Sequence, residues 1–267
     1  MIYYLSCTGN TRMAAERLAA LLGEDTADIS AMGEKSHTLQ QLREGERLGF
    51  CFPVHGWRPP KKFREFVWRM QADGINKPGY IFALMTCGDT IGETTRYLRR
   101  DLHESGLWLD AAFDVRMPNT YVGLPLMDVD KPSLERLKLT QAVERVEETA
   151  RRIEEGYKGE DLHFVGRWPR INSRMLGALF ARWLVTDKPF RVDAGKCRRC
   201  GKCAIVCPVE NIKAMKGNLP QWGRKGNCMA CFACYHHCPQ KAISYGRATC
   251  GKGQYKEGFR KRYRRVL

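Results

Sequence analysis

The sequence of 267 residues lacks the features that mark membrane-spanning and exported proteins. It contains no apolar run of about 18 residues, the length that a transmembrane helix requires. It begins on the strand-like segment MIYYLS, without a basic flank or a cleavage site, so we expect no secretory signal and a cytoplasmic protein. Its twelve cysteines therefore predict metal or redox chemistry in a reducing compartment rather than a disulfide framework.

Acidic residues are scarce in the last 80 residues. Residues 1–187 contain 26 Lys and Arg against 26 Asp and Glu, whereas residues 188–267 contain 19 against 3. The formal charge of +16 therefore belongs wholly to the C-terminal segment. This break in composition predicts a neutral domain over 1–156, a helical linker over 157–187, and a basic domain with a basic tail over 188–267.

Strand-like and helical patterns alternate along the N-terminal domain. Strands are predicted over 1–6, 26–30, 47–54, 79–86 and 109–117, and helices over 11–22, 60–71, 92–105 and 133–156. Such alternation predicts an α/β fold in which helices cover both faces of a parallel sheet.

The linker contains the amphipathic segment SRMLGALFARWLV. A helix would place its large apolar residues on one stripe, namely Met175, Leu176, Leu179, Phe180, Trp183 and Leu184. We expect this helix to pack against one of the domains; a membrane-surface helix is the alternative.

Two common nucleotide-binding patterns are absent from the first loop, SCTGNT. The loop has no lysine and so is not the G-x-x-x-x-G-K-S/T type, and it does not read G-x-G-x-x-G. It does offer the hydroxyls of Ser6, Thr8 and Thr11, with backbone N–H groups around Gly9, in front of a helix. A helix N-terminus binds phosphate without needing a cationic side chain.

The segment YLSCTGNTRMAAERL resembles the flavodoxin signature, and FPVHGWRPP and TCGDTIGET resemble the second and third flavin loops of that family. The resemblance implies a doubly wound, five-stranded parallel sheet with FMN bound at the carboxyl ends of its strands. It also implies that Trp57 stacks on the isoalloxazine and that the peptide of Gly56 is free to flip. The FMN-binding residues implied are Ser6, Cys7, Thr8, Gly9, Asn10, Thr11, Pro53, Val54, His55, Gly56, Trp57, Thr86, Cys87, Gly88, Asp89 and Gly92.

The roles of one histidine and three cysteines near this site each have two interpretations. His55 is either a plain loop residue or a group that tunes flavin protonation. Cys7, Cys51 and Cys87 are interpreted as small buried hydrophobic residues rather than redox groups.

Eight cysteines form two runs, CRRCGKCAIVCP and CMACFACYHHCP, each of the form C-x-x-C-x-x-C-x-x-x-C-P. Both resemble the bacterial two-cluster ferredoxin pattern, in which the fourth cysteine of one run binds the other cluster. The resemblance implies an α+β ferredoxin-like domain with two [4Fe–4S] clusters, one held by Cys197, Cys200, Cys203 and Cys238, the other by Cys228, Cys231, Cys234 and Cys207. Structural zinc is the competing hypothesis. His236 and His237 are expected on a helix surface, and Cys250 is not assigned as a ligand.

Nearly the whole chain, except the helical linker, resembles the fused flavodoxin–ferredoxin proteins. The resemblance implies an electron-transfer protein that passes electrons between FMN, two [4Fe–4S] clusters and a redox partner, for which the basic domain predicts an acidic docking face. No catalytic acid–base set and no nicotinamide fingerprint is present, which favours a carrier. Two alternatives remain: a flavin-dependent reductase with the clusters as electron inlet, and a redox sensor that binds nucleic acid through the tail YKEGFRKRYRRVL.

Overall fold

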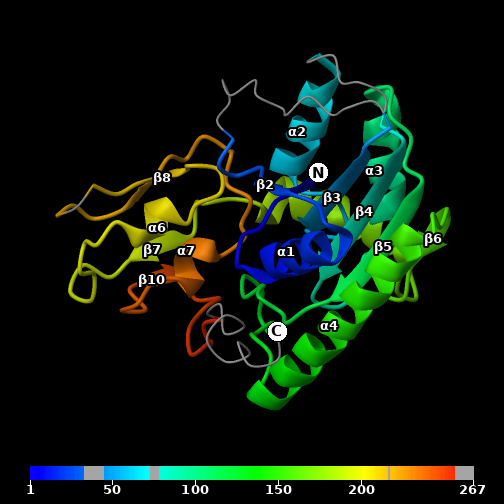
Figure 1. Cartoon of the computed structure of the whole chain (residues 1–267). Coiled ribbons are helices and arrows are strands. Elements are labelled where there is room, and N and C mark those ends of the chain that lie inside the picture. The colour runs from blue at the N-terminus through cyan, green and yellow to red at the C-terminus, as the bar shows by residue number, and fades with distance from the viewer. Residues whose placement is uncertain (33–44, 73–77, 216, 256–267) are drawn as a thin grey trace.

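The computed structural model describes residues 1–32, 45–72, 78–215 and 217–255. The N-terminal part is a wholly parallel sheet with strand order β2-β1-β3-β4-β5-β6 (Figure 1). Its strands are β1 (Ile2–Tyr4), β2 (Thr26–Asp28), β3 (Arg47–Pro53), β4 (Tyr80–Cys87), β5 (Ala111–Arg116) and β6 (Gly159–Asp161). The order reverses between β1 and β3, and this switch point is where ligands bind in such sheets.

Two pairs of helices cover the two faces of the sheet. Helices α1 and α4 pack on one face, and α2 and α3 pack on the other (Figure 1). Their bounds are α1 (Asn10–Leu22), α2 (Lys61–Ala72), α3 (Thr94–Glu104) and α4 (Pro132–Glu154). The central strands β3 and β4 are buried on both faces, which explains why their sequences, RLGFCFP and YIFALMTC, are almost continuously apolar. The predicted flavodoxin-like fold is confirmed.

A sixth strand extends the five predicted from the sequence. The three residues of β6 pair with β5, and the chain that follows β6 is fixed by the buried Asp114, which accepts the backbone N–H groups of His163 and Phe164 at 2.8 and 2.7 Å. Arg145 of α4 donates to the carbonyl of Asp114 and to the carboxylate of Asp161. A strand so short carries no periodic signal, and tertiary contacts decide its position.

The C-terminal part is a small α+β unit. It contains the antiparallel pair β7 (Phe190–Val192) and β10 (Ile243–Tyr245), a second pair β8 (Ile212–Lys213) and β9 (Gln221–Trp222), and the one-turn helices α6 (Lys202–Ile205) and α7 (Ala233–His236). Its core is aromatic: the rings of Phe190 and Trp222 stack with centroids 5.4 Å apart, and Phe232 and Tyr245 pack beside them.

The helix predicted between the two parts spans residues 169–184, here named the connector helix. It is π-helical over Ile171–Leu176 and Phe180–Leu184 and α-helical over Gly177–Leu179. It packs on the N-terminal part as expected, but the interpretation of its apolar stripe was wrong. Met175, Leu176, Leu179 and Trp183 are exposed, and the small residues Ser173 and Gly177 make the packed face. The predicted domain boundaries stay a prediction.

No helix within the described residues is long and apolar enough to cross a membrane.

Candidate cofactor sites

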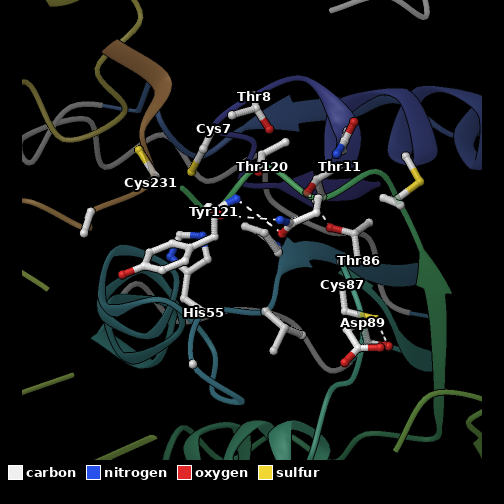
Figure 2. Close-up of a pocket in the computed structure, with 18 of the residues that line it drawn as sticks. Cys7, Thr8, Thr11, His55, Thr86, Cys87, Asp89, Thr120, Tyr121 and Cys231 are labelled. Atoms are coloured by element: carbon white, nitrogen blue, oxygen red, sulfur yellow. Dashed lines mark hydrogen bonds between the residues drawn. The ribbon is translucent and has the colours of Figure 1, made fainter. Parts of the chain in front are cut away.

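Four loops at the carboxyl ends of β1, β3, β4 and β5 surround a cavity of about 240 Å³ (Figure 2). Thirteen of the sixteen residues predicted to bind FMN line it: Cys7, Thr8, Asn10, Thr11, Pro53, Val54, His55, Gly56, Trp57, Thr86, Cys87, Gly88 and Asp89. Segments far apart in sequence meet here because the carboxyl ends of parallel strands share one edge of the sheet.

Three predicted residues lie just behind this cavity. Ser6 and Gly9 line a neighbouring cleft of about 610 Å³ between the first loop and the segment around α6. Gly92 packs against Trp57, because a Cβ built on this glycine would lie 2.9 Å from the Trp57 Cβ atom. The Ser6 hydroxyl is buried and has no hydrogen-bond partner among the described residues, so it is available to a bound phosphate.

The first loop has the geometry of an anion cradle. Gly9 holds a left-handed φ of +99° at the start of α1, and no side chain caps that helix. The first N–H groups of a helix have no acceptor within the helix, so they remain available to a phosphate. The Thr11 hydroxyl already bonds the Thr86 hydroxyl at 2.7 Å, and the Asn10 amide donates to the Pro118 carbonyl at 3.0 Å. These two side chains therefore tie the cradle to the neighbouring loops.

The second loop is held in a strained conformation. Gly56 and Trp57 have φ values of +55° and +59°, which is unusual for a tryptophan. The Trp57 indole N–H donates to the Thr90 hydroxyl at 2.9 Å and so joins the second loop to the third. Burial lowers the pKa of His55 to about 4, so this imidazole is neutral at pH 7. It can exchange hydrogen bonds with a flavin but carries no charge toward it.

Sequence reasoning missed several residues that line the cavity. They are Thr90, Met117, Pro118, Asn119, Thr120, Tyr121, Leu124, Met127, Phe180, Met229, Ala230 and Cys231. The segment 117–121 follows β5 and could have been found by the same strand-end argument as the other loops. Phe180 and residues 229–231 carry no local signal, because only long-range packing brings them here.

The first predicted ligand set lies around one small cavity. Cys197, Cys200, Cys203 and Cys238 all line it, so the fourth cysteine of the second run joins the first three of the first run. Burial raises the pKa of the Cys203 thiol to about 11, and the nearby Cys238 and Cys197 raise it further. Bound iron would replace these protons, because thiolate is the form that binds metal.

The second predicted set is also gathered in one place. Burial raises the pKa of Cys228 to about 12 and that of Cys234 well above its usual range, and in both cases Cys231 and Cys207 contribute as neighbouring charges.

The two runs share one backbone design. Backbone N–H groups donate to the sulfur atoms of Cys197 and Cys228 at 3.4 Å and to those of Cys207 and Cys238 at 3.3 Å. Equivalent positions hold left-handed backbone in both runs: Arg199 and Ala230, Gly201 and Phe232, Glu210 and Lys241. Hydrogen bonds to ligand sulfurs are one way in which a protein tunes a cluster.

The phosphate cradle and the second cysteine set touch each other. Cys7 and Cys231 both line the cavity, and the interaction between their thiols raises the pKa of Cys7 and lowers the pKa of Cys231. Figure 2 shows both residues at the edge of the cavity. Cys7 is only partly buried, whereas Cys51 and Cys87 are buried and have raised thiol pKa values.

The expectation that His236 lies on a helix surface was wrong. His236 is fully buried, and its Nδ1 accepts the Tyr255 backbone N–H at 3.0 Å. Its Nε2 must then carry the proton that is donated to the Thr120 carbonyl at 2.7 Å. Burial lowers its pKa to about 4, in keeping with this neutral form. His236 therefore joins α7 to the loop after β5.

Comparisons with known proteins agree with this geometry. A family model described as a flavodoxin domain matches residues 1–128, and one described as a 4Fe-4S dicluster domain matches residues 190–239. A search of curated proteins found no match to the chain.

Solved structures similar to this chain include three flavodoxins. That of Streptococcus pneumoniae is 14% identical over 58% of this chain and 97% of its own, with a TM-score of 0.38. The WrbA-like flavodoxin of Agrobacterium tumefaciens is 18% identical over 57% and 96%, with a TM-score of 0.32. That of Fusobacterium nucleatum, bound to flavin mononucleotide, is 11% identical over 59% and 97%, with a TM-score of 0.36.

Proposed function

Because the chain joins a flavodoxin domain to a 4Fe-4S dicluster domain, we propose that it carries electrons between FMN and two [4Fe–4S] clusters and on to a redox partner protein. One observation carries this proposal. Cys231, assigned as a ligand of the second cluster, lines the same cavity as Cys7 and the other residues of the proposed flavin loops. The two redox sites therefore share a wall.

Different residues of the chain would bind the phosphate and the ring of FMN. The unpartnered Ser6 hydroxyl and the N-terminus of α1 would bind the phosphate, and residues 53–57 and 86–89 would enclose the ring. Tyr121 and Phe180 close the cavity from other elements, with ring centroids 5.4 Å apart. When bound, FMN exchanges one or two electrons and each cubane exchanges one.

The first cysteine set offers a contact point for a partner. Cys200 is exposed, and the exposed cations Arg198, Arg199 and Lys202 line the same cavity. Such a basic rim suits an acidic redox protein, since opposite charges speed encounter. The proposed route runs from that partner through the first and second clusters to the flavin, or in the reverse direction.

The first test is the cofactor content of protein purified without oxygen. We expect about one FMN and about eight iron per chain, with matching sulfide and no zinc. Photoreduction of the flavin should then reduce a cluster within the same molecule, at a rate that does not depend on protein concentration. Zinc in place of iron, or a rate that rises with concentration, would contradict the proposal.

The two alternative functions gain no support from the described residues. The tail on which the nucleic-acid hypothesis rests lies almost entirely beyond residue 255 and thus outside them. A reductase would show steady turnover of a small acceptor with dithionite as donor, and a carrier would not.

A further inference from the structure

The connector helix exposes a stripe of large apolar side chains. Between 40 and 68% of each is accessible to solvent, although isolated exposed hydrophobic residues are the normal case on a protein surface. The stripe consists of Ile171, Met175, Leu176, Leu179 and Trp183 on the helix, with Trp168 immediately before its first residue. A contiguous stripe of this kind marks an interaction surface.

The opposite face of the helix is fixed to the flavin loops, so the stripe cannot turn inward. The Ser173 hydroxyl accepts the Glu93 backbone N–H at 2.7 Å, and the Arg58 guanidinium donates to the Ser173 carbonyl at 2.8 Å. A Cβ on Gly177 would lie 2.5 Å from the Gly56 carbonyl oxygen, so the two backbones are in close contact. The exposure is therefore a property of the folded chain.

The segment that carries the stripe has charges of one sign. Residues 162–186 contain no Asp or Glu, and the exposed arginines of this segment are Arg167, Arg170, Arg174 and Arg182. Of these, Arg174 pairs with Glu93 at 2.7 Å. The chain as a whole adds a formal charge of +16. A surface that complements the stripe must therefore be apolar inside and anionic outside.

We propose that the connector helix binds the surface of an anionic lipid bilayer, with its apolar stripe inserted among the acyl chains and its arginines at the headgroups. Tryptophans at both ends of the stripe favour lipid, since their rings prefer the membrane–water interface. A helix with Trp and Leu on one face and arginine beside them is the usual interfacial anchor. Phe180 of the same helix lines the cavity, so docking would hold that cavity close to the membrane.

The test is flotation of the full-length protein with vesicles of phosphatidylglycerol and phosphatidylcholine. Wild-type protein should float with mixed vesicles and much less with pure phosphatidylcholine. The double variant Leu179→Ser, Trp183→Ser keeps every charge and should partition at least tenfold more weakly. Trp108→Ser is the matched control, because Trp108 is equally exposed at 66% but lies outside the stripe, and it should float as wild type does.

Several results would overturn the proposal. One is flotation of the double variant equal to that of wild type, which would mean that the basic C-terminal part adsorbs by charge alone. Another is the absence of flotation with any vesicle. Concentration-dependent dimers that the double variant abolishes, without flotation, would assign the stripe to a second copy of the chain. Retained FMN and cluster absorbance in each variant shows that it is folded.

Discussion

At the scale of single residues, Cys7 is the most informative position. It lies in the first loop, yet its thiol is close enough to Cys231, a predicted cluster ligand, for the interaction to raise the pKa of Cys7 and lower that of Cys231. A hydrogen bond to a ligand sulfur stabilises the added electron and so raises the reduction potential.

Replacing this thiol should therefore lower the potential of one cluster. In Cys7→Ala the second cluster should become harder to reduce by about 40 mV, the equivalent of one hydrogen bond of about 1 kcal/mol. Potentiometric titration followed by electron paramagnetic resonance measures it. Cys51→Ala, buried within β3, is the control and should leave both potentials unchanged. An unchanged potential in Cys7→Ala would show that the contact is lost when the cluster is bound.

Trp57 tests the assignment of the flavin loops. Its indole lines the cavity and bonds Thr90, so Trp57→Ala removes both ring contact and the link between two loops. We expect FMN to bind with about thirtyfold higher Kd, which corresponds to about 2 kcal/mol. Titration of FMN-free protein by flavin fluorescence gives the constant. Trp108→Ala should leave it unchanged, and an equal Kd for Trp57→Ala would show that the loop is misassigned.

His236 predicts how stability depends on pH. Its folded pKa of about 4 lies below its ordinary value of 6.5, so the unfolded chain takes up a proton first as pH falls. Its contribution is complete above pH 6.5 and is lost as pH falls from 6.5 to 4, at up to about 1.4 kcal/mol per pH unit. His55 acts in the same direction.

The measurement is urea unfolding of cluster-free protein at pH 7.5 and 5.0. The midpoint should fall at pH 5.0, and the fall should be smaller in His236→Asn. If the midpoint of His236→Asn falls between pH 7.5 and 5.0 as much as that of wild type, His236 is not the cause of the pH dependence.

At the scale of elements, the connector helix acts as a clamp on the second flavin loop. Replacing a helical glycine by alanine normally stabilises a helix by about 1 kcal/mol. At Gly177 the new Cβ would meet the Gly56 carbonyl oxygen at 2.5 Å, and backbone on both sides cannot move cheaply. The clash should therefore outweigh the gain in helix propensity, so that Gly177→Ala lowers the stability of the protein.

Gly177→Ala should lower the thermal unfolding midpoint by several degrees and weaken FMN binding, since the loop it displaces lines the cavity. Calorimetry and flavin titration measure the two effects. Ala178→Val, a half-buried neighbour on the same helix, adds more bulk and should still change both values much less. A stabilised Gly177→Ala protein would mean that the close contact relaxes.

At the scale of the whole molecule, the C-terminal part contributes to the wall of the cavity at the carboxyl ends of the strands. Residues 229–231 line it, the Tyr255 hydroxyl donates to the Asn10 carboxamide at 2.7 Å, and His236 bonds Thr120. Electron transfer between the two parts should thus occur within one packed body rather than by encounter.

Salt should slow electron transfer from a partner protein but not electron transfer within the chain. Reduction of the protein by an acidic ferredoxin should slow several-fold between about 20 and 300 mM salt, because the basic surface is screened. The transfer between cluster and flavin should not change. Stopped-flow absorbance follows both, with neutral viologen radical as the control reductant. An internal rate that falls with salt would mean that the parts separate in solution.

The sequence by itself determined the five main strands, the four large helices and the eight spaced cysteines. Each of these features is a pattern within a short segment. The position of most flavin-loop residues followed as well, because parallel strands must present their carboxyl ends at one edge. Even the duplicated cysteine runs kept equivalent backbone conformations at Arg199 and Ala230.

Only the tertiary structure decided which side chains face each other across long separations. It buried His236 and brought Phe180 and Cys231 to the cavity, and it turned the apolar stripe of the connector helix outward. The spacing of the apolar residues predicts that they share one face of the helix. It does not predict whether that face packs against the protein or is exposed. Small residues such as Ser173 and Gly177 decided which face of the helix packs, because they allow its backbone to approach the second loop closely.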